Sequence, residues 1–212
     1  MITKTNPPKW IEDQVISRGI TEDRVISALQ KVPRQEFVPL ELRNKAYEDG
    51  PLPIGYDQTI SQPYIVAYMS FLAELSKDQK VLEIGTGSAY QSAILGELVS
   101  EVYSIEIVEP LAIKAAATLE KLGYSNIYTK TGDGYLGWAQ KAPFDVIILT
   151  ASPPKVPEPL FQQLEINGRL IAPVGVNEQR IFRWTKLASE NFHKDTFLPV
   201  SFVPMTGKAQ GA

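Results

Sequence analysis

The stretch that decides the fold is VLEIGTGSAYQSA, residues 81–93. An apolar run is followed by Gly85, Gly87 and Ser88, and then by a segment of helical character. This order aims backbone N–H groups at a bound ligand, because the glycines let the chain turn tightly at the start of a helix. Turn glycines alone would look the same, so the stretch needs further support. Tyr90 stands where a dinucleotide fingerprint has its third glycine, which disfavours NAD.

The sequence around this stretch alternates short apolar runs with helical segments. The runs are VLEIG, VYSIEI, NIYTKTGDG, FDVIILT and GRLIAPVG, and we expect helices over residues 88–99 and 110–122. RIFRWTKL and LPVSFVPM indicate two further strands, with a loop over 188–195 between them. Alternation of this kind is typical of βαβ units. We predict an α/β fold with a Rossmann-like, doubly wound and mostly parallel sheet.

The chain before this alternating region is expected to be helical. Thr21 can cap a helix that Pro33 stops, and residues 63–75 show the spacing of an amphipathic helix with a proline in its first turn. A Pro- and Gly-marked stretch separates the two helices. Residues 1–78 are therefore predicted to form an N-terminal helical extension, packed as one compact unit with the core, residues 79–212.

Carboxylates are expected at the ends of three successive strands. Glu106 lies near the end of VYSIEI, where it can accept both hydroxyls of a ribose, and Asp133 lies in a GDG turn, where it can accept from an adenine amine. Each could instead be an ordinary strand end or turn residue. With Glu83 they fall where open α/β sheets bind ligands, and as a set they suit a cationic adenosyl ligand.

Composition excludes several other classes of protein. The 212 residues carry a net charge of −3, which gives no drive toward nucleic acid or an anionic membrane. The absence of cysteine and the single His193 exclude thiolate zinc sites, cysteine nucleophiles and paired-histidine metal sites, so no metal is expected. No run approaches 18 apolar residues and the first ten residues lack a signal-peptide core. We expect a soluble, cytoplasmic monomer.

A series of longer strings, in order along nearly the whole chain, carries a family resemblance. They are RGITEDRVISAL, VPRQEFVP, AYEDGPLPIG, QTISQPYIVAYM, VLEIGTGSAYQSA, GDGYLGW, PFDVIILTA, GRLIAPVG and FVPMTG. With them the chain resembles the protein-L-isoaspartate O-methyltransferases, a family of class I S-adenosylmethionine enzymes. The resemblance implies methyl transfer from S-adenosyl-L-methionine to the free carboxylate of isoaspartyl residues in peptides and age-damaged proteins. It also implies S-adenosyl-L-homocysteine as product and repair through a succinimide.

The resemblance also implies roles for particular residues. On the cofactor side, the loop would include Glu83, Gly85, Gly87 and Ser88, Glu106 would bind the ribose, and Asp133 and Gly134 would bind the adenine. Near the transferred methyl would lie Thr59, Ile60, Ser61 and Tyr64, and of these Thr59 and Ser61 would also contact the substrate. Thr206 would add a C-terminal contact to the cofactor. Ala89 departs from the glycine usual in the family. If its φ is positive, the methyl group costs about 1 kcal/mol or more in strain.

The implied reaction needs little from the protein beyond positioning. A carboxylate is already an anion at pH 7, so no general base is required, and His193 is expected to be an exposed residue in a polar loop. Ser61 is the candidate catalytic residue, as a donor that orients the substrate carboxylate. From spacing alone Ser61 would be a helix N-cap, and only the resemblance of QTISQP favours catalysis.

Two alternative functions stay open from the sequence. Ser152, Pro153 and Pro154 resemble the start of the motif of an amino-group methyltransferase acting on nucleic acid, but Lys155 stands where an aromatic ring would stack a base. The second alternative is a catalytically silent binding module of the same fold, since fold does not imply function.

Overall fold

A seven-stranded sheet forms the centre of the protein in the computed structural model, which describes residues 6–211. Residues 1–5 of the predicted N-terminal segment and residue 212 of the predicted core lie outside this range. The strand order is β5-β4-β3-β6-β7-β8-β9. Neighbours from β5 to β7 pair in parallel, whereas β7, β8 and β9 pair antiparallel. The strands are β3 (Lys80–Ile84), β4 (Glu101–Glu106), β5 (Ile127–Thr131), β6 (Phe144–Leu149), β7 (Leu164–Val174), β8 (Gln179–Ala188) and β9 (Asn191–Val200).

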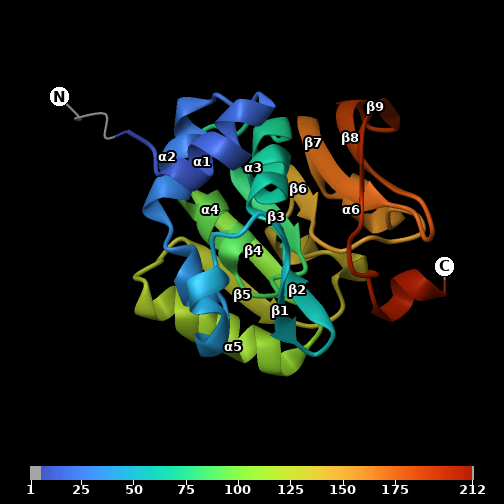
Figure 1. Cartoon of the computed structure of the whole chain (residues 1–212). Helices are drawn as coiled ribbons and strands as arrows, with labels where there is room; N and C mark the ends of the chain where they lie inside the picture. The colour runs from blue at the N-terminus through green and yellow to red at the C-terminus, as the bar shows by residue number, and fades with distance from the viewer. Residues whose placement is uncertain (1–5, 212) are drawn as a thin grey trace.

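Helices cover both faces of this sheet, so the predicted α/β, doubly wound and mostly parallel architecture is confirmed (Figure 1). Alternate strand residues enter separate apolar clusters, as Val81 and Leu82 do, because successive side chains of a strand point to opposite faces. One face carries α1 (Lys9–Gln14), α2 (Asp23–Lys31), α3 (Pro63–Leu72), α4 (Tyr90–Leu98) and α5 (Glu109–Lys121). The other face carries α6 (Glu158–Gln162) and the 3₁₀ helices Gly134–Leu136, Ala139–Lys141 and Gly207–Gln210.

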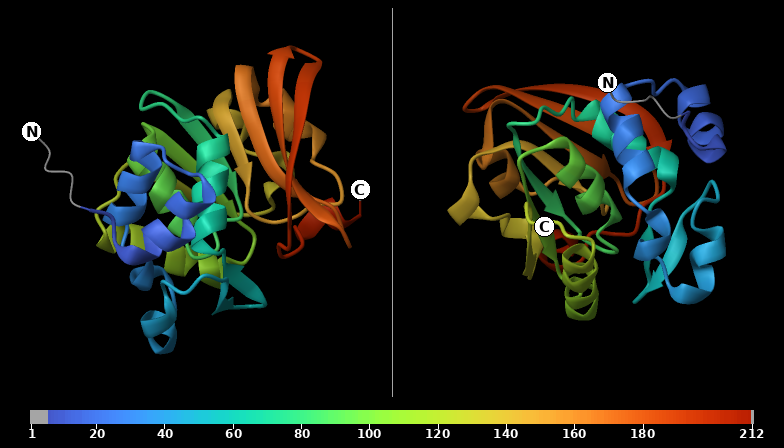
Figure 2. Two further views of the ribbon diagram at one scale, coloured as in Figure 1. Left: turned by 45° about the horizontal axis from the view of Figure 1, so that its top comes forward. Right: turned by 90° about the vertical axis from the view of Figure 1, so that its left-hand side faces the viewer.

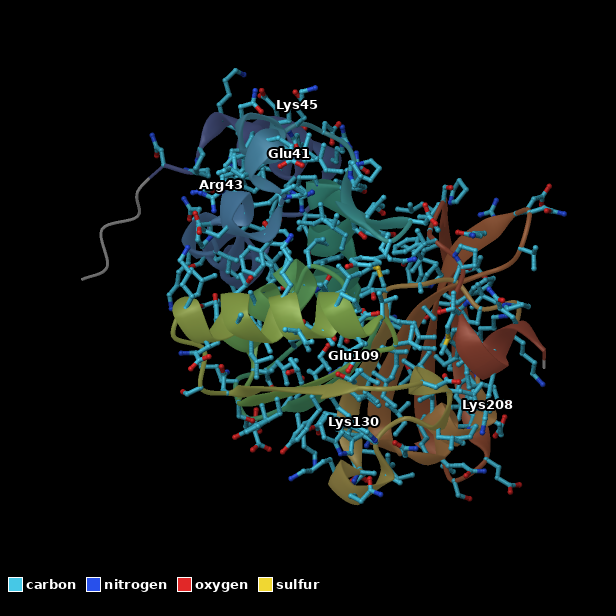
Figure 3. All side chains as sticks on the ribbon, turned by 90° about the horizontal axis from the view of Figure 1, so that it is seen from below. Glu41, Arg43, Lys45, Glu109, Lys130 and Lys208 are labelled. Carbon is cyan, nitrogen blue, oxygen red and sulfur yellow. The ribbon has the colours of Figure 1, made fainter. Side chains whose placement is uncertain are left out.

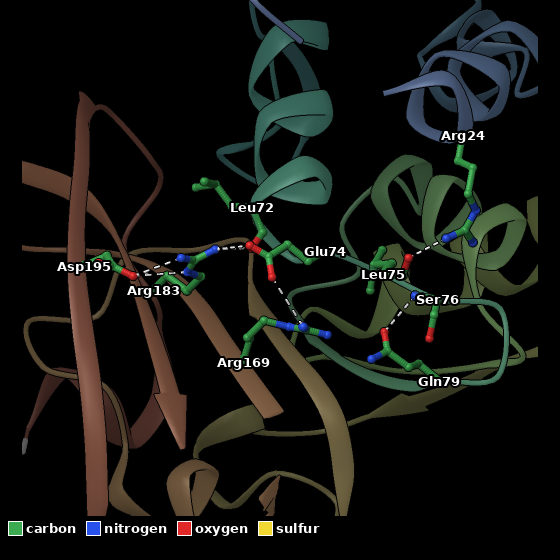
Figure 4. A network of polar contacts seen from close by, with 9 residues as sticks. All are labelled: Arg24, Leu72, Glu74, Leu75, Ser76, Gln79, Arg169, Arg183 and Asp195. Atoms are coloured by element: carbon green, nitrogen blue, oxygen red, sulfur yellow. Dashed lines mark hydrogen bonds and ion pairs between the residues drawn. The ribbon is translucent and has the colours of Figure 1, made fainter. Parts of the chain in front are cut away.

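The N-terminal segment is tied to the sheet through α3. Figure 2 shows α3 between the N-terminal helices and the antiparallel strands β7–β9. Glu74, just after α3, pairs with Arg183 of β8 at 2.7 Å and with Arg169 of β7 at 3.6 Å (Figure 4). Arg24 of α2 donates to the carbonyl oxygens of Leu75 and Leu98. Side chains of α1–α3 share one apolar cluster with those of α4 and α5.

Three helix boundaries differ from the sequence-based expectation. Glu22, not Thr21, is the N-cap of α2, and its side chain makes no capping bond. The helix expected over 63–75 ends at Leu72, because the chain turns into a positive φ of 48° at Glu74. The helix expected from 88 begins at Tyr90, because Ala89 has φ 70°.

The end of the sheet also differs from the expectation. β9 (Asn191–Val200) occupies most of the expected loop 188–195, and only residues 189–190 form the turn. Polar residues here look like a loop in sequence, but backbone pairing with β8, such as Thr185 opposite His193, makes them an edge strand. Residues 201–205, expected to be strand, form only an isolated bridge from Pro204 to Ser152.

A two-stranded hairpin in the N-terminal segment was not expected. β1 (Leu52–Gly55) pairs antiparallel with β2 (Gln58–Ile60), and Tyr56 and Asp57 between them have φ near 55°. Two consecutive positive φ values match a type I′ turn, which joins strands tightly. The hairpin delivers the QTIS segment to the carboxyl ends of the parallel strands. The other 3₁₀ helices of this segment are Ile16–Arg18, Arg34–Phe37 and Leu40–Lys45.

Candidate active site

A cavity lies where β3, β4 and β6 end, at the edge of the sheet where open α/β folds bind ligands. Segments that are far apart in the chain, between Gln58 and Thr206, meet in it. They are Gln58–Ser61 of the hairpin, Ile65, Val66 and Met69 of α3, Ile84–Ser88 with Tyr90 and Gln91, Ile105–Val108, Gly134, Thr150 and Ala151, and Phe202–Thr206. Of the charged side chains in residues 6–211, Glu106 alone is among those lining it. The cavity is thus suited to a cationic ligand.

The glycine-rich loop forms one wall and depends on Gly85. Gly85 has φ 100°, and a Cβ there would lie 2.4 Å from the Thr150 hydroxyl oxygen. That hydroxyl donates to the carbonyl oxygens of Ile84 and Gly85, and the Gly85 N–H donates to Ile105 at 2.8 Å. The loop is therefore tied to both neighbouring strands, β4 and β6, in a form that only glycine allows at this position.

Glu106 closes the loop at the end of β4. Its carboxylate oxygens accept from the N–H of Gly87 at 2.7 Å and of Val108 at 2.8 Å. A carboxylate has about four acceptor positions, so two remain for the hydroxyls of a ribose. Glu106, Gly85, Gly87 and Ser88 thus meet in the cavity, as predicted residues of one site.

The predicted substrate-side residues Thr59, Ile60 and Ser61 line the opposite wall. Ser61 is not the N-cap of α3, because Gln62 occupies that position and makes no side-chain capping bond. The side-chain amide of Gln62 instead donates to Asp49 at 2.7 Å. Within residues 6–211 the Ser61 hydroxyl has no hydrogen-bond partner, which leaves it available to a ligand in the cavity.

Glu83 does not line the cavity, although the sequence suggested a place beside Glu106. Alternation along β3 turns its side chain under α4, where its Oε2 accepts from the hydroxyls of Ser92 and of Ser104, the latter at 2.6 Å. The side chain is fully buried, and this burial raises its pKa to about 7. Glu83 therefore joins β3, β4 and α4 behind the cofactor loop.

Asp133 is likewise outside the cavity lining, whereas its neighbour Gly134 lines it. One Asp133 oxygen accepts from the N–H of Tyr135 and the other from the N–H of Lys208, both at 2.9 Å. The carboxylate fastens the C-terminal 3₁₀ helix beside the site, and Thr206, just before that helix, lines the cavity as predicted.

Tyr64 lies on another face of α3 from Ile65 and Met69, which line the cavity. Its ring stacks on Tyr68, with ring centres 5.7 Å apart, and the Arg18 guanidinium lies 5.0 Å from its centre. Residues four apart share one helix face, so the Tyr64–Tyr68 pair is turned away from the cavity. The structure does not bring Tyr64 to the other predicted residues.

Several lining residues were not singled out from the sequence. The segment Phe202–Met205 lines the cavity beside Thr206, held by N–H to carbonyl bonds of 2.9 Å between Ser152 and Val203 and between Met205 and Ser152. FVPMTG is one of the strings that carry the family resemblance, but no periodic signal assigns an irregular segment to a site. The segment after β9 reaches the cavity only because tertiary contacts with Ser152 hold it there.

Two other sequence hypotheses meet the structure away from the cavity. His193 is exposed, as expected, but it lies on β9 rather than in a loop, with Nε2 3.0 Å from Asp195. Ser152 is buried and its hydroxyl donates to the Gly175 carbonyl at 3.0 Å, so it does not present an amino-methyltransferase motif to the cavity. Acidic and basic side chains are interspersed on the face in Figure 3, with Glu41 near Arg43 and Lys45.

The described part of the chain holds neither a cluster of metal-ligating side chains nor a helix that could span a membrane. Residues 6–211 contain no group of three or more His, Asp or Glu side chains placed to hold a metal ion. None of the helices formed by these residues is long and apolar enough to cross a membrane.

The sheet order, the glycine loop and the carboxylate closing it define a class I S-adenosylmethionine-dependent methyltransferase. The sequence model of the protein-L-isoaspartate(D-aspartate) O-methyltransferase family matches residues 8–210. The chain belongs to this family, which confirms the resemblance, the carboxyl O-methyltransferase activity and S-adenosylmethionine as cofactor.

Individual relatives agree with this assignment. A protein-L-isoaspartate O-methyltransferase of Opitutus terrae is 53% identical, over 92% of this chain and 84% of the relative. That of Gloeobacter violaceus is 52% identical, over 92% of this chain and 96% of the relative. A solved protein-L-isoaspartate O-methyltransferase superposes with a TM-score of 0.87 at 29% identity, covering 96% of this chain and 67% of that one.

Proposed function

We propose that this enzyme methylates the free α-carboxylate of L-isoaspartyl residues in peptides and age-damaged proteins, with Ser61 as the catalytic residue that orients that carboxylate. One observation carries the proposal: the Ser61 hydroxyl, unpartnered among the described residues, lies in the same cavity as the cofactor loop. Within residues 6–211, Glu106 is the one charged side chain that lines this cavity. A site with no lysine, arginine or histidine among these lining residues suits a nucleophile that is already ionised.

The residues of the cavity fit S-adenosylmethionine. Glu106 would accept from the ribose hydroxyls while it keeps its bonds to Gly87 and Val108, and Gly134 would lie at the adenine. Asp133 and Glu83 would act from behind, by holding the C-terminal segment and the β3–α4 turn. S-adenosylmethionine supplies a methyl group on a positively charged sulfur.

The chain's part in methyl transfer is to hold the substrate in line and exclude water. Ser61 donates a hydrogen bond to one carboxylate oxygen, which leaves the other free to attack the methyl. Thr59 and the apolar Ile60 complete this wall, and Met69 lies on the adjoining helix. Opposite charges attract more strongly when water is excluded, and positioning alone is worth up to roughly 7–11 kcal/mol. No proton has to be removed by the protein.

The product explains repair without a further enzyme step. The ester replaces a poor carboxylate leaving group, so the next backbone nitrogen attacks the ester carbonyl and expels methanol. The resulting succinimide hydrolyses to a mixture of normal and isoaspartyl linkages. Repeated cycles of methylation and hydrolysis therefore lower the amount of the isoaspartyl linkage.

The N-terminal segment and the core would act as one unit in this reaction, because each supplies a wall of the cavity. A monomer suffices, since one chain lines the whole site. The net charge of −3 and the interspersed surface charges favour peptides over nucleic acid as partners, and the cytoplasm stays a prediction from the sequence.

A matched pair of peptides tests the proposal. The two peptides differ only in an isoaspartyl or a normal aspartyl linkage, and each is incubated with S-adenosylmethionine carrying a labelled methyl group. We expect label in the isoaspartyl peptide only, and chromatography over time should show ester, then succinimide, then normal peptide. Equal labelling of both peptides, or label on an amine, contradicts the proposal. Cofactor binding without any transfer indicates the silent binding module.

A further inference from the structure

Arg34 is a buried cation that the methyl-transfer scheme does not use. Its side chain is fully buried, and no carboxylate in residues 6–211 forms an ion pair with it. Burial lowers its pKa to about 10, since the charged form loses its hydration. A buried charge without a partner of opposite sign is costly, so its retention calls for a specific role.

The guanidinium joins two segments through their backbone. Nε donates to the Ala46 carbonyl and Nη2 to the Ser61 carbonyl, both at 2.7 Å. Ala46 precedes the hairpin, which begins at Leu52, and Ser61 follows directly after its last residue, Ile60. One planar group thus holds the chain at both ends of the segment that forms the substrate wall.

The same guanidinium also reaches the cofactor side. Its carbon lies 4.8 Å from the centre of the Tyr90 ring, and Tyr90 begins α4 and lines the cavity. Phe37, from the same 3₁₀ helix as Arg34, meets that ring edge-on at 5.5 Å. Nη1 of Arg34 and the Tyr90 hydroxyl are both buried, and neither has a hydrogen-bond partner elsewhere within residues 6–211. The cation is therefore held by two carbonyls and an aromatic face.

We infer that Arg34 is a positioning residue for methyl transfer, which fixes the Ser61 backbone, and through it the Ser61 hydroxyl, relative to the cofactor helix. The inference rests on the proposed role of Ser61. This positioning role requires the planar, forked guanidinium of arginine. A lysine ammonium keeps the charge, but it cannot span two carbonyls and stack on a ring in the same way.

Arg34→Lys tests this geometry, with Arg24→Lys as the matched control. Arg24 also donates to two backbone carbonyls, those of Leu75 and Leu98, but it does not line or contact the cavity wall. Rates are counted per cofactor-binding site, found by titration with S-adenosylmethionine well below each melting temperature. We expect kcat to fall tenfold or more in Arg34→Lys with the cofactor Kd within threefold of wild type, and to stay within twofold in Arg24→Lys.

A double variant separates positioning from general loosening. If Arg34 acts through Ser61, then Arg34→Lys combined with Ser61→Ala should be no slower than Ser61→Ala alone. An unchanged kcat per site in Arg34→Lys, or a double variant in which the two losses multiply, overturns the inference. Arg34→Met replaces the lysine variant if the latter does not bind cofactor. An inactive wild type would instead contradict the proposed function, so the two failures are distinguishable.

Discussion

The two walls of the cavity are built in different ways. The cofactor wall comes from one βαβ unit, in which Gly87 bonds Glu106 only 19 positions away. The substrate wall is a short hairpin followed by Ser61, whose carbonyl is held by Arg34 of a separate 3₁₀ helix, 27 positions away. The first wall is set by local sequence and the second by tertiary contacts. Damage to them should therefore show in different measurements, cofactor affinity for the first and turnover for the second.

The largest effect is expected from Ser61→Ala on the substrate wall. Loss of one preorganised donor costs about 10²–10³ in kcat, whereas cofactor affinity and stability should change little, because the hydroxyl has no partner within the described residues. Steady-state kinetics and a thermal melt measure the two. His193→Ala on β9 is the control and should keep the wild-type rate. Activity that merely follows unfolding would return Ser61 to a structural role.

Glu106→Ala should weaken cofactor binding at the cofactor wall. Charge-assisted hydrogen bonds are worth about 1.5–3 kcal/mol, so the Kd for S-adenosylmethionine should rise about 10- to 150-fold. Calorimetric titration measures this, and saturating cofactor should restore much of the rate. Glu106→Gln keeps the shape of the side chain but not its charge, so its Kd should lie between those of the wild type and Glu106→Ala. An unchanged Kd in the alanine variant would remove Glu106 from the site.

Glu83→Gln probes the support behind the cofactor wall through pH. The pKa of Glu83 in the folded protein is raised to about 7, above its unfolded value, so its proton favours folding at low pH. This stabilisation is present below the unfolded pKa and is lost as pH rises toward 7. The wild type should lose roughly 2–3 kcal/mol relative to Glu83→Gln between pH 5 and pH 8. Urea unfolding at both values measures the difference, and parallel pH profiles would contradict it.

Ala89→Gly should give the smallest effect and sharpens the account of the cofactor loop. Ala89 has φ 70° and ψ 10°, a conformation that costs an alanine about 1–2 kcal/mol. Glycine relieves this strain but loses more entropy on folding, about 0.4–1 kcal/mol, so a net gain below about 1 kcal/mol is expected. A denaturation midpoint that falls would show that packing of the buried methyl outweighs the strain.

The sequence by itself determined the parallel core and the cofactor wall. A strand, a glycine turn and a helix follow one another in VLEIGTGSAYQSA, and Glu106 ends the next strand, so their contacts span few residues. Gly123 after α5, with φ 80°, ends a helix as expected, for the same local reason. Propensity, period and turn chemistry act over such short distances and can be read directly.

Only the tertiary structure decided which side chains face the cavity. Glu83 and Tyr64 lie in the right motifs, but the alternation of β3 and the turn of α3 point them elsewhere. β9 is a strand because β8 offers it a partner, and Arg34 supports the substrate wall because the carbonyls of Ala46 and Ser61 both accept from its guanidinium. No periodic pattern in the sequence marks these contacts, because they depend on how the elements pack against one another. The direction of a side chain and its long-range partner exist only once the chain has packed.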